Sequence, residues 1–165
     1  MNTDPQEQAI KLARIGIIRS PFRETAGMPI QPVFADGAQG TVDVFAQYAE
    51  GLRDLEGFDR LWLVYWLHKA PPGPLRVIPF RDTTERGVFA TRAPCRPNAI
   101  GLSCVRLLSV SGNVLTVAGV DILDGTPLLD IKPYVPEFDA FPTSHAGWLD
   151  TSNTQRTKAD NRFDR

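Results

Sequence analysis

Residues 102–120 read LSCVRLLSVSGNVLTVAGV, two apolar, branched runs that flank Ser111-Gly112-Asn113. Glycine and asparagine adopt the positive φ angles of tight turns, so this stretch predicts a β-hairpin. Short strands separated by turn residues are typical of a β-barrel or a β-sandwich. Further runs of strand length occur at 12–19, 41–45, 61–67, 75–80, 87–91 and 128–132.

The run at 61–67, LWLVYWL, is continuously apolar and aromatic, which predicts a strand buried on both faces. The best helical segment is 44–55, and Gly57, just after it, favours the end of a helix. A doubly wound α/β fold needs long helices between its strands and a glycine-rich loop between a strand and a helix. The sequence offers neither. We therefore expect a mainly β protein with one or two short helices.

The chain has 165 residues, the length of one domain. Its hydrophobic fraction of 42% excludes a wholly disordered protein. We expect a flexible arm at 1–11, a working domain at 12–149 and a mobile polar tail at 150–165, which holds only Ala159 and Phe163 as apolar residues. The sequence has no membrane-length apolar run and no signal peptide, which favours a soluble, cytoplasmic protein.

The charges nearly cancel, with 18 Lys and Arg against 19 Asp and Glu. This balance excludes a basic, nucleic-acid-binding surface that extends over the whole chain, so any such contact depends on a local patch. Five arginines within 76–96 form the one candidate phosphate-binding surface, and a solvated face is the alternative. Cys95 and Cys104, like His68 and His145, lack the spacing of a zinc site. We therefore expect reduced thiols and no metal.

The segment 87–103, GVFATRAPCRPNAIGLS, combines two prolines with Arg92 and Arg96. Proline fixes φ and removes a backbone donor, which predicts a rigid, irregular loop. A rigid loop that presents two arginines suits an anionic or carbonyl-bearing ligand. A proline-braced connection with solvated arginines is the alternative.

The segment 121–134, DILDGTPLLDIKPY, places Asp130 and Lys132 two residues apart, hence on one face of a strand. They form either a surface ion pair or part of a pocket. His68 ends the apolar run at 61–67. A histidine at that place either separates core from solvent or faces a ligand at the mouth of a barrel.

Five segments in order resemble the TsaA/TrmO family of S-adenosylmethionine-dependent tRNA methyltransferases. They are IGIIRSPF (15–22), PIQP (29–32), LEGFDRLWLVYWLH (55–68), 87–103 and DILDGTPLLDIKPYVP (121–136). The resemblance covers about residues 14–149. It implies a small closed β-barrel unlike the Rossmann methyltransferases, a homodimer with its cofactor near the subunit interface, and methylation of N6 of threonylcarbamoyladenosine at position 37 of tRNA.

The resemblance also implies which residues form the site. Three positions depart from the family pattern: Ile30 replaces an arginine, Cys95 a histidine and Ala99 a proline. The substrate candidates, for the anticodon loop and the threonyl carboxylate, are Arg92, Arg96 and Asn98. The cofactor candidates are Pro29, Ile30, Gln31, Leu67, His68, Arg92, Leu102, Thr126, Pro127 and Leu128.

Methyl transfer needs the nucleophile in line with the methyl carbon and removal of the N6 proton. The candidates for catalysis are Asp130, Lys132 and Tyr134, which alternate along one strand. Asp130 would accept a proton or orient Lys132. Lys132 would stabilise charge on the urea carbonyl or hold the substrate carboxylate, and Tyr134 would stack on the base or form a hydrogen bond with it. The alternatives are methylation of a small molecule or another RNA, or a non-catalytic barrel that binds S-adenosylmethionine.

Overall fold

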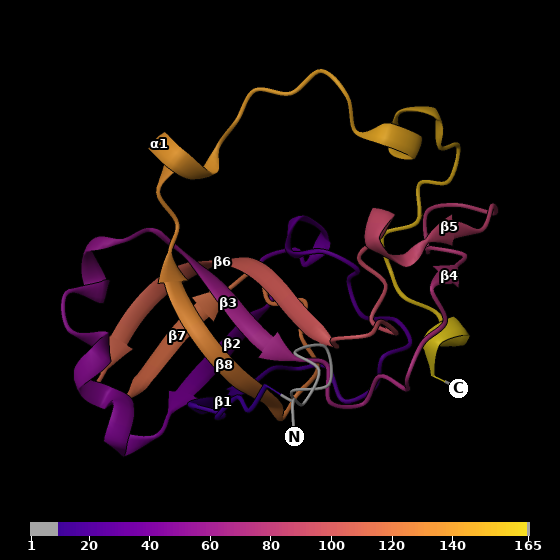
Figure 1. Cartoon of the computed structure of the whole chain (residues 1–165). Coiled ribbons are helices and arrows are strands. Elements are labelled where there is room, and N and C mark those ends of the chain that lie inside the picture. Colours follow the sequence, from indigo (N-terminus) through magenta and orange to yellow (C-terminus); the bar gives the residue numbers. More distant parts are fainter. Residues whose placement is uncertain (1–9, 165) are drawn as a thin grey trace, which may run out of the picture.

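In the computed structural model, which describes residues 10–164, six strands close into an antiparallel barrel (Figure 1). Their order around the barrel is β1-β2-β7-β6-β3-β8, and β8 pairs back with β1. The expected mainly β, closed-barrel fold is therefore confirmed. The barrel strands are β1 (Gly16–Arg19), β2 (Gln39–Val44), β3 (Arg60–Trp66), β6 (Ile100–Ser111), β7 (Val114–Ala118) and β8 (Thr126–Pro133).

The hairpin that decides the fold class forms between β6 and β7. Ser111 pairs with Val114, and Gly112 occupies the turn with φ of +59°, a conformation that glycine adopts without strain. The register of this pair shifts between Leu107 and Ser109, so a β-bulge interrupts β6. Bulges bend and twist a strand, which helps a sheet of only six strands to close.

Strand β3 corrects the prediction of a strand buried on both faces. Leu61 and Leu63 are fully buried, whereas Trp62 and Val64 are half-buried and Trp66 is exposed. Burial alternates because a barrel wall has only one interior face. The continuous apolar run therefore marks a wall whose outer surface is also apolar.

The interior of the barrel is filled by alternate side chains from all six strands and from the link between β7 and β8. Its members are aliphatic and branched, as expected for interdigitating strand faces. The fully buried residues of this core are Ile18, Val42, Val44, Leu61, Leu63, Val105, Leu115, Val117, Val120, Ile122 and Leu128.

The predicted helix at 44–55 is wrong as a regular α-helix. After β2 the chain forms two 3₁₀ turns, η3 (Ala46–Leu52) and η4 (Leu55–Gly57). Asp54 between them has φ of +67°, which interrupts a helix, and Leu52 and Leu55 both enter the barrel core. Among the described residues the α-helical part is α1 (Pro136–Asp139).

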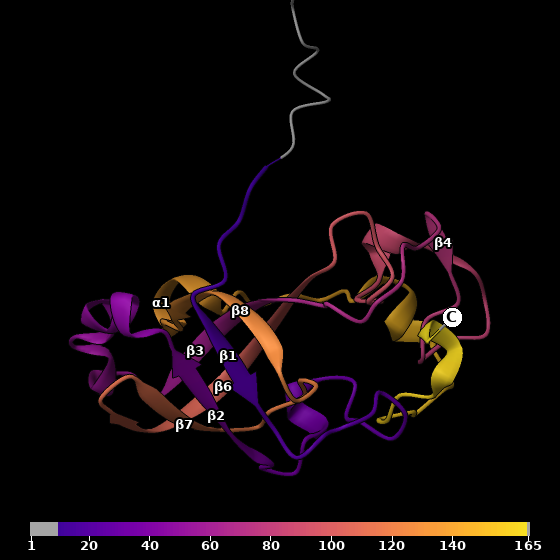
Figure 2. The same cartoon turned by 90° about the horizontal axis from the view of Figure 1, so that it is seen from below.

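A second, smaller layer lies beside one end of the barrel (Figures 1 and 2). It contains the short strands β4 (Arg76–Val77) and β5 (Arg86–Gly87). The strands predicted at 75–80 and 87–91 are thus much shorter, because Pro79 lacks an N–H and the chain turns into η5 after Gly87. Three 3₁₀ turns complete the layer: η5 (Val88–Ala90), η6 (Gly147–Thr151) and η7 (Asn161–Phe163).

The last part of the chain, residues 152–164, lies against the segment 27–30. Gly27 donates its N–H to the Ala159 carbonyl at 2.9 Å, and Ile30 donates to the Thr157 carbonyl at 3.0 Å. Phe163 packs against the small core of Val77 and its neighbours in this layer. The mobility expected of 150–165 stays a prediction for the protein in solution.

The remaining expectations on organisation concern the N-terminus and the membrane. Of the arm predicted at 1–11, residues 1–9 lie outside the described part of the chain. Between residues 10 and 164, no helix is long and apolar enough to cross a membrane.

Candidate functional site

A cleft of about 700 Å³ opens at the end of the barrel where β3 ends and β6 and β8 begin. Tyr65, Gly101 and Thr126 form its inner part. The segments 28–31 and 159–164 close it from outside, so the small layer and the barrel together build its walls.

Arg92 stands at the mouth of this cleft. Its guanidinium donates a hydrogen bond to Oε1 of Gln31, and the Gln31 amide nitrogen donates to the Ile30 carbonyl at 2.6 Å. The side chain of Arg92 is exposed, and no carboxylate of the described residues forms an ion pair with it. Arg92 is therefore held in place with its charge available to an anion.

Arg96 braces the loop between η5 and β6. Its guanidinium donates to the backbone carbonyls of Thr91 and Ala93 at 3.3 and 3.4 Å. The buried Thr91 hydroxyl donates to the Val88 carbonyl at 2.8 Å. The loop thus has the irregular, internally bonded geometry expected of its two prolines, and Arg96 contributes to that geometry as well as to the cleft wall.

The thiol of Cys95 is a structural part of the same loop. Cys95 is buried, and its Sγ donates to the Phe163 carbonyl at 3.5 Å. Burial raises the pKa of the Cys95 thiol, which keeps it in the unreactive protonated form. Gly73 passes so close that an added Cβ would lie 2.3 Å from the Cys95 carbonyl oxygen, so only glycine fits there.

A chain of three polar side chains runs from the barrel interior into the cleft. The Tyr65 hydroxyl and Ser103 Oγ are 2.9 Å apart, and Ser103 Oγ donates to Oδ1 of Asp121 at 2.6 Å. Tyr65 pairs with Gly101 across β3 and β6, and a Cβ on Gly101 would lie 2.1 Å from the Tyr65 ring. The glycine therefore lets the ring lie flat on the wall and directs its hydroxyl towards Ser103.

Burial shifts the pKa values of Asp121, Tyr65 and His68, which lie in or beside this hydrogen-bonded group. Burial raises the pKa of Asp121 from 3.8 to about 6, although the Ser103 hydrogen bond and the Arg92 charge oppose the rise. Burial, followed by the Asp121 charge, raises the pKa of Tyr65 and keeps its phenol protonated. Burial and the Lys69 charge lower the pKa of His68, which also lines the cleft, so its imidazole is neutral at pH 7. A carboxylate that titrates near neutrality in a cleft is typical of functional sites.

The structure gathers most of the predicted cofactor and substrate positions at this one cleft. All three substrate candidates, Arg92, Arg96 and Asn98, line it. Pro127 and Leu128 do not, since Pro127 pairs with Ile17 on the barrel wall and Leu128 is fully buried in the core. The cofactor candidates that line the cleft are Pro29, Ile30, Gln31, Leu67, His68, Arg92, Leu102 and Thr126.

The three predicted catalytic residues share one face, but it is the outer wall of the barrel. Asp130 and Lys132 form an ion pair of 2.8 Å between Oδ2 and Nζ. The Tyr134 ring follows β8 and lies 5.8 Å from the Trp62 ring, centre to centre. None of the three belongs to the lining of the cleft in their own chain.

The sequence interpretation missed Tyr65, Ser103 and Asp121 as a connected group. One signal was present: Gly101, Ser103 and Val105 alternate on the inward side of β6, and a serine at an inward position needs a polar partner. The identity of that partner depends on the barrel closure, which brings residues 65, 103 and 121 together.

The fold and the cleft define a class of protein: a closed antiparallel β-barrel with a ligand site at one end. The chain belongs to the TrmO family, since the model of the tRNA-methyltransferase O N-terminal domain matches residues 17–140. A crystal structure of TrmO from Pseudomonas aeruginosa is similar, with a TM-score of 0.74, 40% identity and coverage of 89% of this chain.

Two curated relatives show how far the similarity extends. A probable S-adenosyl-L-methionine-binding protein of Pyrococcus abyssi is 50% identical over 90% of this chain and 82% of its own length. The tRNA (adenine(37)-N6)-methyltransferase of Escherichia coli K12 is 36% identical over 87% of this chain and 66% of its own length. The chain covers 64% of the P. aeruginosa TrmO chain, so it spans less than two thirds of that protein.

Proposed function

We propose that this protein is an S-adenosylmethionine-dependent methyltransferase that methylates N6 of adenosine 37 in tRNA, in its threonylcarbamoylated form. Family membership and the name of the E. coli relative support the reaction class. The observation that carries the proposal is that eight of the ten positions expected to bind cofactor line one cleft.

The residues of the cleft fit the chemistry of this cofactor. S-adenosylmethionine supplies a methyl group on a positively charged sulfur, together with a carboxylate, an ammonium group and an adenine. Arg92 suits the carboxylate, and the Asp121 carboxylate suits a positive charge. Leu67, Ile100 and Leu102 offer apolar surface of the kind that an adenine ring contacts.

The chain's own proton acceptor in this cleft is Asp121. N6 of the modified adenosine carries a proton that has to leave when the methyl group arrives. A carboxylate with its pKa raised to about 6 matches the pH at which a general base works well. Ser103 fixes the orientation of Asp121 through Oδ1, which leaves Oδ2 for the proton.

A catalytic role of Asp130, Lys132 and Tyr134 requires a second protomer whose cleft faces this outer wall. We propose a homodimer that provides this arrangement. Exposed apolar side chains on the same wall support it: Trp66, Ile100 and Leu102 are 51%, 42% and 50% exposed, and Ile100 and Leu102 also line the cleft. Methyl transfer from a sulfonium needs no metal, and a tRNA substrate implies a cytoplasmic protein, so both expectations belong to this proposal.

Titration calorimetry with S-adenosylmethionine and S-adenosylhomocysteine tests the cofactor, with micromolar affinity near one site per chain expected. Incubation with threonylcarbamoylated tRNA, digestion and mass spectrometry then test the acceptor. Cofactor binding without S-adenosylhomocysteine production would indicate a non-catalytic barrel. S-adenosylhomocysteine production without a methylated tRNA nucleoside would indicate a small molecule or another RNA as acceptor.

Two variants separate the proposed roles. Arg92→Gln is expected to weaken cofactor binding, whereas Arg53→Gln, at the exposed position that directly follows η3, is the matched control with the same loss of charge. Mixing Lys132→Ala protomers with Arg92→Gln protomers tests the dimer. If the sites are shared between protomers, the mixture regains part of the activity that each variant lacks alone.

A further inference from the structure

A second cleft of about 700 Å³ lies on the outer wall of the barrel, between η2 (Pro32–Phe34) and the strands β3 and β6. Four arginines from four separate segments line it: Arg60, Arg81, Arg92 and Arg106. No aspartate or glutamate belongs to its lining among residues 10–164. We call it the arginine cleft.

The arginine cleft contains a pair of like charges that the fold alone does not favour. Arg60 of β3 and Arg106 of β6 are direct cross-strand partners, and both side chains are exposed. Side chains in such a pair start about 4.5–5.5 Å apart, and like charges placed there destabilise a sheet. Within the described range neither arginine has an ion-pair partner. An anion bound between them would remove the repulsion.

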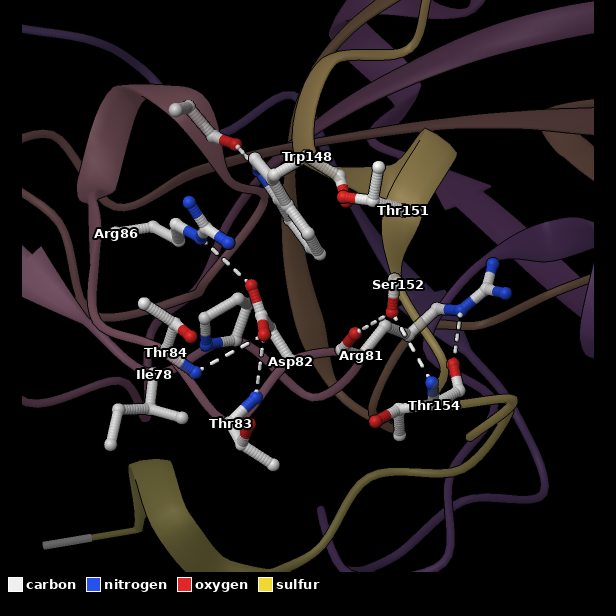
Figure 3. A network of polar contacts seen from close by, with 12 residues as sticks. Ile78, Arg81, Asp82, Thr83, Thr84, Arg86, Trp148, Thr151, Ser152 and Thr154 are labelled. Atoms are coloured by element: carbon white, nitrogen blue, oxygen red, sulfur yellow. Dashed lines mark hydrogen bonds and ion pairs between the residues drawn. The ribbon is translucent and has the colours of Figure 1, made fainter.

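The arginines of the stretch 76–96 are, by contrast, mostly occupied within the protein. Arg76 pairs with Glu85 at 3.2 Å, and Arg86 pairs with Asp82 at 2.7 Å (Figure 3). The Arg86 guanidinium also lies over the Trp148 ring, 5.7 Å from its centre. The phosphate-binding surface expected along this stretch is therefore reduced mainly to Arg81 and Arg92, which both reach the arginine cleft.

Arg81 is oriented by neutral groups that leave its charge uncompensated. Its Nε donates to the Thr154 carbonyl at 3.3 Å, and a terminal nitrogen donates to Oε1 of Gln155 at 3.2 Å. Its guanidinium lies 5.8 Å from the centre of the Phe34 ring on η2. Figure 3 shows the Arg81 side chain extending towards Thr154, away from the Asp82–Arg86 pair.

We propose that the arginine cleft binds successive phosphates of the RNA backbone and guides the strand to the cofactor cleft. The two clefts share Gln31, Arg92 and Leu102. A strand whose phosphates contact Arg106, Arg60 and Arg92 in turn would therefore reach the cofactor cleft. Planar guanidinium groups bind phosphate oxygens in pairs. Trp62 in the same cleft offers a ring on which an unpaired base stacks. This inference rests on the proposed RNA substrate.

The test measures binding of fluorescently labelled tRNA by anisotropy between 50 and 200 mM KCl. The variants are Arg60→Gln, Arg106→Gln and the double variant, with Arg53→Gln as the control of equal charge. Each cleft variant is expected to weaken binding by on the order of tenfold and to lower the salt slope by about one. S-adenosylhomocysteine affinity, measured by calorimetry, is expected to stay unchanged in all of them. Arg106→Gln is expected to keep or raise the melting temperature, because it removes a like-charge contact.

Several results would overturn the proposal. Wild-type tRNA affinity in the double variant, or an equal loss in Arg53→Gln, removes the specific role of the cleft. Loss of S-adenosylhomocysteine binding in the variants assigns these arginines to the cofactor site. If the wild type binds S-adenosylhomocysteine and methylates a small molecule but not tRNA, both the RNA cleft and the proposed acceptor fail. If the variants methylate tRNA with unchanged salt dependence, the proposed function stands and the arginine cleft alone fails.

Discussion

Replacing Asp121 by asparagine is expected to make the protein more stable at pH 8 and less active. The pKa of this carboxyl rises from 3.8 to about 6 on folding, chiefly because partial burial removes water from the charged form. Each tenfold change in ionisation is worth about 1.36 kcal/mol, so the charged form costs the folded state about 3 kcal/mol above pH 6. Asparagine keeps the shape and the oxygen that accepts from Ser103, without the charge.

The sign of the pH dependence follows from proton binding. Between about pH 4 and 6 the folded state holds the Asp121 proton and the unfolded state releases it, so the stability of the wild type falls as the pH rises. The Asp121→Asn variant lacks this loss. Its advantage should be small near pH 4 and reach roughly 1–3 kcal/mol at pH 8, after allowance for the new amide donor.

Thermal unfolding of both proteins at several pH values between 4 and 8 measures this difference. For a domain of this size, 1–3 kcal/mol corresponds to a rise in melting temperature of roughly 2–12 °C. Asp43→Asn, a half-exposed carboxylate on β2 that pairs with Arg19, is the control. A difference in melting temperature that is the same at pH 4 and pH 8, or an Asp121→Asn variant that melts below the wild type at pH 8, would refute the reasoning.

Three further perturbations probe the packing around the cleft. Gly101→Ala is expected to cost roughly 1–3 kcal/mol in chemical denaturation because its Cβ would enter the Tyr65 ring, whereas Gly51→Ala, in open space, should cost little. In a Cys104→Ser background, which removes the half-buried second thiol, the Cys95 thiol should react slowly with a thiol reagent at pH 8 until the protein unfolds, so rapid labelling of the native state would contradict its burial. Arg96→Gln should raise the KM for S-adenosylmethionine more than it lowers kcat, because it loosens the loop without touching the proposed base; an unchanged KM would argue against that bracing role.

The sequence predicted the parts of the fold that depend on local signals. Ser111-Gly112-Asn113 marks the β6–β7 hairpin. The preference of glycine for positive φ is local and does not depend on which residues pack around the turn. The segment 44–55 carries a helical pattern, yet the chain forms 3₁₀ turns there, because Leu52 and Leu55 reach the core on either side of Asp54. Tertiary packing decides between these two kinds of helix, and no local pattern reports it.

The candidate site shows the same division. The loop with Arg92 and the segment at Gln31 were identified from the sequence, and the structure joins them by a hydrogen bond. The link between Tyr65, Ser103 and Asp121 joins residues that lie far apart in the chain, so only the closed barrel reveals it. The sequence also could not predict that Asp130 lies outside the cleft. The alternation of Asp130 and Lys132 shows that they share a strand face, but not whether that face points into or out of the barrel.

The hydrogen bonds between 27–30 and 157–159 couple the docking of residues 152–164 to ligand binding in the cleft. A ligand that contacts Pro29, Ile30 and Asp160 favours the docked form of the chain end, and by linkage the docked end favours the ligand. Trypsin cleaves after Arg156 and Lys158, which lie within this docked segment. The rate of that cleavage should therefore fall as the cleft fills, and would report its occupancy without a label.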